Sequence, residues 1–359
     1  MEYVKLEEIC TIVSGGTPSR SKSDYWNNGN IPWIKIKDMK SKYIDSAEEF
    51  ITEEGLNNSS TKMLKSDTIL YSIFATLGEV GILKIDACTN QAIAGLSLKE
   101  DSNILKEYLY YYLKSKKKDV NNLGRGVAQN NINLSLLRKF RIPVIPLHQQ
   151  KKIIEVLDNV SSTINNYERE LALLDELVKA RFVEMFGEIE DCDKWESKIW
   201  NEVVTIKNGR DYKKVLVSDG GYPVVGTGGE IARASKYLCP ENTIVVGRKG
   251  SINNPMLMKE KFWNVDTAFG VIPNSDYLHY QYFYCFCKFY NFMKLNKATT
   301  LPSTTKADLL KIRINIPPLE LQNQFASFVQ EIDKSRSRIQ KSLEASQELF
   351  DSLMQEYFG

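Results

Sequence analysis

Two stretches of the chain carry apolar residues at alternating steps of four and three. The first stretch runs from Ile153 to Val178, and no proline interrupts it. This 3.5-residue spacing is typical of a helix whose apolar seam packs against another helix. The second stretch, Phe325 to Tyr357, keeps the phase but carries Arg336 and Ser346 at two seam positions. The pattern predicts two long helices, over 147–187 and 319–359, each spanning roughly 60 Å.

A single helix of this kind cannot bury its seam alone. Two separate dimerisation helices, each meeting a second copy of the chain, would satisfy the pattern. Because both helices lie in one chain with matching phase, we favour their packing against each other. The residues between them must bring the chain back, so we expect an antiparallel coiled coil.

An internal repeat relates the two halves of the chain. Shifted by 172 residues, Leu137–Ile142 falls on Leu309–Ile314 and Gln150 falls on Gln322. Phe186–Gly187 falls on the last two residues, Phe358–Gly359, so the second copy ends where the chain ends. Two copies are too few for a solenoid, so we expect a duplicated module with a pseudo-two-fold axis. Shorter anchors align between the helices: Asp67–Ile69 with Asn242–Ile244, and Gln91–Ile93 with Thr267–Phe269.

The remaining segments, 1–146 (domain 1) and 188–318 (domain 2), alternate short apolar runs with turn residues. This pattern favours α+β domains. A helix is expected over about 106–117, with a counterpart near 280–294. The expected strands are Ile31–Ile36, Thr68–Ile73, Gly81–Ile85, Tyr222–Gly226, Thr243–Gly247 and Phe269–Ile272.

Composition narrows the class of protein. The 43% hydrophobic content supports buried cores, but no apolar run approaches the length of a membrane span. The first residues lack the plan of a signal peptide, so we expect a cytoplasmic protein. Six cysteines without CxxC spacing are interpreted as reduced, mostly buried thiols. Only two histidines are present, which argues against a histidine-based metal site.

Charge is segregated along the chain. Residues 1–146 and 191–318 have net charges of +3 and +6, whereas residues 147–190 and 319–359 have −4 and −3. Basic segments favour a polyanionic partner, and the acidic helices need a different one. The sequence has no phosphate-binding GxxxxGK[ST] loop, GxSxG elbow or HExxH motif, so we do not expect catalysis by this chain.

Loops in both basic segments combine Arg or Lys with Ser, Thr, Asn, Gln and aromatic residues. Arg and Lys neutralise phosphates, while Arg, Asn and Gln also bond base edges in the major groove. Taken singly, each loop is better explained as an ordinary solvated surface loop, but the recurrence of such loops in both domains favours DNA binding. The candidate DNA-binding residues are Thr17, Ser19, Arg20, Lys22, Trp33, Lys35, Lys37, Tyr71, Arg125, Gln129, Asn130, Asn131, Arg210, Lys213, Lys214, Thr227, Arg233, Arg248, Lys249, Lys297, Thr300 and Ser303.

These residues and their order resemble the DNA-specificity subunit of type I restriction–modification systems. The resemblance covers the whole chain, in the order domain, helix, domain, helix. Its motifs are Gly15–Ser19 with Tyr25–Trp26 and Asn30–Ile34, Ile142–Leu147 with Gln149–Gln150, Ile314–Leu319 with Gln322, and Tyr222–Val224 with Gly247–Gly250 and Trp263–Ala268.

The resemblance implies that each domain is a target recognition domain for one half of a split site in double-stranded DNA, with the helices as a spacer. It also implies two adenine-methylating subunits on the helices, joined by nuclease–translocase subunits. S-adenosylmethionine, ATP and Mg²⁺ would belong to those partners, with no cofactor in this chain. One departure is that Leu301–Ser303 stands where the first copy has Gln129–Asn131.

Two other functions remain open from the sequence. One is a free-standing regulator that reads two DNA half-sites without a methyltransferase. The other is a coiled-coil scaffold that does not bind DNA.

Overall fold

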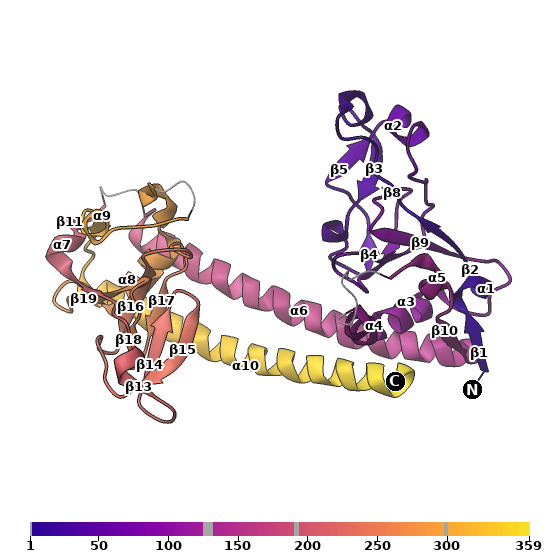
Figure 1. Cartoon of the computed structure of the whole chain (residues 1–359). Coiled ribbons are helices and arrows are strands. Elements are labelled where there is room, and N and C mark those ends of the chain that lie inside the picture. Colours follow the sequence, from indigo (N-terminus) through magenta and orange to yellow (C-terminus); the bar gives the residue numbers. More distant parts are fainter. Residues whose placement is uncertain (1, 125–131, 190–193, 298–300) are drawn as a thin grey trace. The chain divides into compact units, whose positions relative to one another are not determined.

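The computed structural model describes residues 2–124, 132–189, 194–297 and 301–359. It divides into two compact units. Unit 1 comprises Met1–Asn166 with Leu343–Gly359, and unit 2 comprises Tyr167–Ser342. Each unit therefore contains one α+β domain together with half of each long helix (Figure 1).

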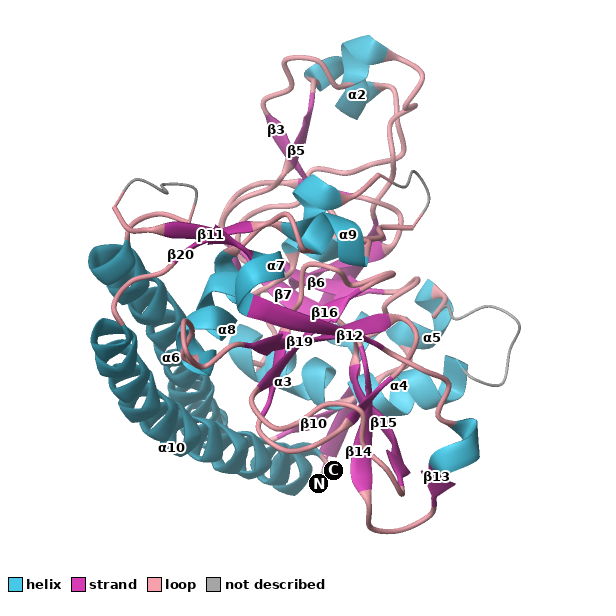
Figure 2. Ribbon diagram, turned by 90° about the vertical axis from the view of Figure 1, so that its left-hand side faces the viewer, coloured by secondary structure: helices cyan, strands magenta, loops and turns pink. Residues whose placement is uncertain are grey.

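The two long helices are α6 (Leu147–Phe186) and α10 (Leu319–Phe358), of 40 residues each. In unit 1, Leu157 of the first half of α6 shares a core with Phe350 of the last half of α10. In unit 2, Val178 of α6 shares a core with Phe325 of the first half of α10. These pairings confirm the antiparallel arrangement, with the helices side by side in Figures 1 and 2.

The polar seam residue Arg336 is accommodated by an ion pair. Its guanidinium lies 3.0 Å from the Asp175 carboxylate of the facing helix, and Lys288 lies 2.8 Å from the same oxygen. Partial burial opposes the charge of Asp175, but these two cations hold its pKa below the ordinary value. The break in the apolar pattern is thus a cross-helix contact.

Domain 1 has two main sheets and a two-stranded sheet of β1 and β10. The larger has the strand order β2-β9-β6-β7-β4 and packs on α3, and the smaller has the order β5-β3-β8. Figure 1 shows the smaller sheet and α2 on the side of the domain away from α6. The strands are β1 (Glu2–Lys5), β2 (Cys10–Ser14), β3 (Ile31–Ile34), β4 (Tyr43–Ile44), β5 (Glu49–Ile51), β6 (Ile69–Ser72), β7 (Val80–Leu83), β8 (Cys88–Thr89), β9 (Ile93–Leu98) and β10 (Arg141–Val144). The helices are α1 (Leu6–Ile9), η1 (Ser23–Tyr25), η2 (Ile36–Asp38), α2 (Glu53–Asn57), α3 (Lys106–Ser115), α4 (Lys117–Gly124) and α5 (Leu134–Arg138).

Domain 2 repeats this plan. Its sheets have the orders β12-β19-β16-β17 and β13-β15-β14-β18, and β11 pairs with β20 as β1 pairs with β10. The strands are β11 (Ser197–Ile199), β12 (Val204–Asn208), β13 (Leu216–Val217), β14 (Tyr222–Gly226), β15 (Gly229–Ala234), β16 (Thr243–Gly247), β17 (Met256–Met258), β18 (Trp263–Asn264), β19 (Ala268–Pro273) and β20 (Arg313–Asn315). The helices are α7 (Trp200–Val203), η3 (Lys213–Val215), α8 (Tyr280–Phe289), η4 (Phe292–Leu295) and α9 (Lys306–Leu309).

The joint between each domain and its long helix rests on one buried amide. Gln150 accepts a hydrogen bond from the Leu105 backbone (2.8 Å) and donates to the carbonyls of Asn103 and Ile145. Gln322, which is 172 residues later, makes the same three bonds in unit 2, to His279, Tyr277 and Pro317. Both side chains are fully buried. The two glutamines that the sequence repeat relates therefore make the same hydrogen bonds in the two units.

The equivalence inside the domains follows a shift of 175 residues. Asp67 and Asn242, which precede β6 and β16, both have positive φ (72° and 59°). The Ile73 amide donates to the Ala92 carbonyl, and the Arg248 amide donates to that of Thr267. The anchor at Gln91–Ile93 was therefore misaligned by one residue, because Ala92 corresponds to Thr267.

The cysteine and membrane predictions concern the described residues. Five of the six cysteines are described, and all five are free and buried. Burial raises the pKa of the Cys10 thiol to about 12, despite the charge of Lys99. Cys192 lies outside the described residues. Among the described helices none is long and apolar enough to cross a membrane, and no group of three potential metal ligands occurs among the described residues.

Candidate nucleic-acid interface

The first candidate loop begins at a close approach of two backbones. The Gly15 amide donates to the Ile93 carbonyl (3.0 Å), and the Gly16 amide donates to the Thr89 carbonyl (2.9 Å). A side chain on Gly15 would overlap the Asn90 carbonyl, so only glycine fits. Gly209 and Arg210 make the equivalent bonds to Ala268 and Asn264 in domain 2. Each domain thus anchors one loop in the same way.

In domain 1 this loop places Arg20 on an aromatic surface. The Arg20 guanidinium lies 3.6 Å from the centre of the Trp26 ring and is paired with Glu49. Glu49 also pairs with Lys35, whose hydrogen bond, with a second from Arg20, lowers the pKa of the carboxyl group below its ordinary value. The loop, the end of β3, and β5, a strand that was not predicted from the sequence, therefore meet at Glu49.

The other candidates of this loop lie on the surface. Lys37 is paired with Glu48, next to Glu49, and Lys22 donates to the Tyr25 hydroxyl (2.9 Å). Thr17 is hydrogen-bonded to Gln91, and Ser19 to Ser21. Each of these four side chains is thus held by a neighbouring side chain.

Two candidates of domain 1 are core residues. Trp33 is 2% exposed, and its indole donates to the Gly16 carbonyl (3.0 Å). Tyr71 is fully buried on β6, and burial raises its pKa. Neither side chain is accessible to a ligand in this structure. Trp33 instead supports the loop through its hydrogen bond to Gly16.

Domain 2 brings three candidates together. Lys249 and Ser303 form a β-bridge, the Gly250 amide donates to the Pro302 carbonyl (2.9 Å), and the Thr304 amide donates to the Arg248 carbonyl (3.0 Å). The loop after β16 therefore lies against the segment before α9. Arg248 and Lys249 are both exposed there.

The remaining candidates of domain 2 lie apart from this pair of loops. Arg233 on β15 is paired with Glu230 (2.8 Å), and Lys297 is paired with Asp308 (2.8 Å). Thr227 follows β14 at a turn. Lys213 and Lys214 are exposed on η3, after the anchored Gly209–Arg210 step.

The candidate cations differ between the domains in their ionic partners. Arg20, Lys35 and Lys37 each have a carboxylate partner. By contrast, no ion pair links Arg210, Lys213, Lys214 or Lys249 to another residue that the structure describes. These four can meet phosphates without first losing an ionic partner. Arg20, Lys35 and Lys37 would have to exchange one, as would Arg233 and Lys297 of domain 2.

Sequence reasoning missed the loop after β6. It corresponds to the Arg248–Ile252 loop, because the Ile132 amide donates to the Ile73 carbonyl (2.9 Å) as that of Thr304 does to Arg248. Ala75 has a φ of 61°, where Gly250 has 81°. At the tip Phe74 is 41% exposed. The alignment of Asp67–Ile69 with Asn242–Ile244, extended forward along the chain, could have identified this loop from the sequence. Arg125, Gln129, Asn130, Asn131 and Thr300 lie outside the described residues.

The architecture of two anchored-loop domains on an antiparallel pair of helices agrees with the family that the sequence matches. The family model for the type I restriction modification DNA specificity domain matches residues 1–175 and again 192–347. The chain belongs to this family, and each match contains one of the two domains. It is a DNA-specificity protein of the type I restriction–modification class.

Individual relatives agree with this assignment. The type I restriction enzyme EcoR124I/EcoR124II specificity subunit of Escherichia coli is 34% identical over 46% of this chain, a match that spans 42% of that protein. The MjaIX specificity subunit of Methanocaldococcus jannaschii is 24% identical over 98% of this chain and 90% of that protein. The crystal structure of a type I restriction–modification S subunit from M. genitalium shares the fold, with a TM-score of 0.59, 16% identity and coverage of 100% of this chain and 96% of that one.

Proposed function

We propose that domains 1 and 2 each read one half of a split target in double-stranded DNA, and that the chain directs partner subunits to it. The partners are two adenine-methylating subunits and the nuclease–translocase subunits that join them. S-adenosylmethionine, ATP and Mg²⁺ serve those partners, and this chain contributes recognition without catalysis.

The observation that carries the proposal is the contrast between shared scaffold and different exposed groups. Equivalent backbone bonds anchor equivalent loops in both domains. At the equivalent tips, domain 1 exposes Phe74 and domain 2 exposes Lys249. Sequence is read by side chains in the grooves, whereas backbone and cationic contacts fix register. Two such readers in one chain suit a target with two different halves.

The long helices support two equivalent partner sites. Leu177 on α6 and Leu349 on α10 are related by the 172-residue shift, and they are 46% and 50% exposed. An exposed leucine on each acidic helix gives an apolar contact within a charged surface. Because the two positions are equivalent, a partner that recognises one also recognises the other.

Methylome sequencing of cells with and without this chain tests the function. We expect adenine methylation at one bipartite motif that disappears with the chain, and co-purification of a methyltransferase with it. DNA binding without a methylation motif or a methyltransferase would favour the free-standing regulator. No DNA binding at low salt would favour the scaffold.

The exposed lysines of η3 provide the test of phosphate contact. Replacing Lys213 and Lys214 by Ala should weaken binding to all DNA sequences and reduce the slope of log affinity against log salt by about one unit per lost contact. The matched control is Lys151→Ala with Lys152→Ala at the start of α6, which removes the same charge from an acidic helix. Equal losses in both double variants, or an affinity independent of salt, would contradict the assignment.

A further inference from the structure

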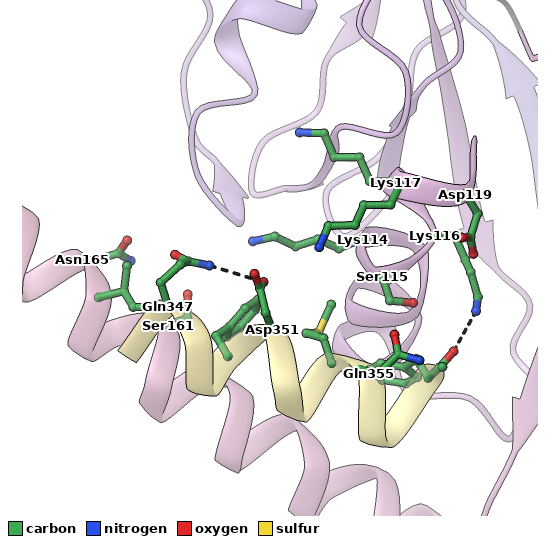
Figure 3. A pocket seen from close by; sticks show the side chains of 16 residues that line it. Lys114, Ser115, Lys116, Lys117, Asp119, Ser161, Asn165, Gln347, Asp351 and Gln355 are labelled. Carbon is green, nitrogen blue, oxygen red and sulfur yellow. Dashed lines mark hydrogen bonds between the residues drawn. The ribbon is translucent and has the colours of Figure 1, made fainter. Parts of the chain in front are cut away.

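A pocket of about 500 Å³ lies in unit 1, where the junction of α3 and α4 faces both long helices. Its floor is apolar and comprises Ile164 of α6 with Phe350 and Met354 of α10. Figure 3 shows Lys114 and Lys117 extending over this floor, with Gln347 and Asp351 of α10 opposite them. The pocket thus combines lysines, amides, the carboxylates of Asp119 and Asp351, and an apolar base.

The cation nearest the floor is Lys114. Its ammonium group lies 5.3 Å from the centre of the Phe350 ring. Burial, and then the neighbouring charge of Lys117, lower the pKa of Lys114. No ion pair of Lys114 occurs within the described part of the chain. An ammonium group in such a place is stabilised by any anion that enters.

The other lysines of the junction are differently engaged. Lys117 is paired with Glu79 (2.6 Å), and Lys116 donates to the Phe358 carbonyl (2.7 Å), as Figure 3 shows for Lys116. Lys118 is exposed at the rim. Three further lysines therefore lie near Lys114 in the lining, together with the carboxylates of Asp119 and Asp351.

Unit 2 shows what is missing from this pocket. Lys288 holds the ninth position of α8, as Lys114 does of α3, and it pairs with Asp175 at 2.8 Å. The residue 172 positions after Asp175 is Gln347, which is neutral and lines the pocket. Lys288 thus has a carboxylate ion-pair partner in unit 2, whereas Lys114 has the Gln347 amide at the equivalent position, with the Asp351 carboxylate within electrostatic reach. The position that Asp175 holds beside Lys288 is open beside Lys114 to an anion from outside the chain.

We propose that this pocket binds a nucleoside phosphate. The phosphate groups occupy the position beside Lys114 that the Asp175 carboxylate holds beside Lys288, where a lysine acts as a point charge for phosphate. The flat base lies on the apolar floor of Phe350 and Met354, and the amide groups of Asn165 and Gln347 meet its polar edge. The volume is that of a small-molecule site, and the lining comes from three sides, which suits a free ligand better than a polymer.

Calorimetric titration of the full chain, without DNA or partner subunits, tests the proposal. The probes are ATP, AMP, adenosine and inorganic tripolyphosphate. ATP should bind most tightly, and adenosine and tripolyphosphate should each bind at least tenfold more weakly, because each lacks one of the two recognised parts. Since no DNA is present, a failure here leaves the DNA-reading function untouched.

Gln347→Asp is the sharpest variant, because it copies the carboxylate of unit 2. It should weaken ATP binding at least tenfold and leave the protein folded, and Lys114→Met should do the same. Lys288→Met, the matched change in unit 2, should leave ATP affinity within twofold. Absence of ATP binding, unchanged binding in Gln347→Asp, or tripolyphosphate binding as tight as ATP would overturn the proposal. So would displacement of ATP by duplex DNA with equal weakening of DNA binding in Lys114→Met, since the pocket would then hold DNA phosphates.

Discussion

Trp33 in domain 1 and Trp263 in domain 2 make the same hydrogen bond from different strands. Trp33 lies on β3 and donates to the carbonyl of Gly16, whereas Trp263 lies on β18 and donates to that of Arg210. β18 corresponds to β8, the neighbour of β3, and the carbonyls occupy equivalent places. Both domains thus support the loop with a tryptophan hydrogen bond, but the tryptophan lies on a different strand in each domain. The carbonyl beneath the loop is hydrogen-bonded in both, because an unpaired carbonyl there would destabilise the loop.

The exposed positions follow no such constraint. Phe74 and Lys249 occupy equivalent tips. Arg20, Lys35 and Lys37 of domain 1 are ion-paired, whereas Arg210, Lys213 and Lys214 of domain 2 have no ion pair among the described residues. Water can hydrogen-bond any exposed polar group, so the side chains at these positions were free to diverge. The two domains thus share the hydrogen bonds of the scaffold and differ in their exposed side chains, and the changes below test this difference.

Exchange of a whole domain should have the largest effect. Replacing residues 191–318 by the same domain of a relative should change one half of the methylated target and leave the other half intact. The measurement is methylation-site mapping. An unchanged target, or loss of both halves, would show that the domains do not read DNA independently.

Lengthening both helices should alter spacing but not the half-sites. One heptad inserted near Leu171 and another near Leu343 adds about 10.5 Å to each helix while keeping the seam in phase. At about 3.4 Å per base pair, the unread spacer of the target should lengthen by up to about three base pairs. Some activity should be lost, because the half-sites also rotate by about a third of a turn. Mapping of methylated sites checks this, and retention of the original spacing would show that the helices do not set it.

Removal of the buried amides should destabilise the two units alike. Gln150→Leu and Gln322→Leu each leave one backbone amide and two carbonyls unpaired, at a cost of about 2–4 kcal/mol in the free energy of unfolding. Denaturant unfolding gives the magnitude, and hydrogen exchange locates the loss in the altered unit. A full effect in one variant with little in the other would mean that the joints are equivalent in geometry but not in energy.

The smallest effect is expected from Glu49→Gln. The carboxylate is partly exposed, so its pairs contribute only about 0.2–1 kcal/mol. Since the pKa of Glu49 is lower in the folded state, this stabilisation is present above the ordinary value of 4.5 and is lost as the pH falls through the lowered pKa. The variant should lack that acid-side loss and should alter discrimination at one half-site only. An equal change at both half-sites would contradict a local role.

The long helices were predictable because their signal is local and extended. A 3.5-residue period over many turns specifies a seam, and the phase match between copies indicated the partner. The polar residue in the seam of the second helix was not predictable in this way. Arg336 is explained by its pair with Asp175 on the facing helix, which the periodicity of one helix cannot reveal. Strands such as β6 and β16 were likewise evident as apolar runs, whereas the sheet orders depend on pairings between distant segments.

The sequence indicated the types of residue in the candidate site but not which of them are buried. Arg20 and Lys37 lie on the surface as expected, yet Trp33 and Tyr71 are buried, because an aromatic residue beside a loop suits a core as well as an interface. The pairing of Lys35 with Glu49 joins the end of β3 to the neighbouring strand β5, which lies beyond η2 and β4 in the chain, so the sequence showed the charges without showing their neutralisation. Phe74 was missed because one phenylalanine in an apolar run gives no sign of exposure.

The division of the long helices has a genetic consequence. Unit 2 is one uninterrupted segment, Tyr167–Ser342, and it carries its own halves of α6 and α10. Both of its boundaries fall within helices, near positions that the repeat relates. A single recombination event that replaced this segment would therefore transfer a recognition domain together with the seam residues that pack beneath it. Exchange of this one gene segment can therefore change the specificity for one half-site while the specificity for the other half-site stays the same.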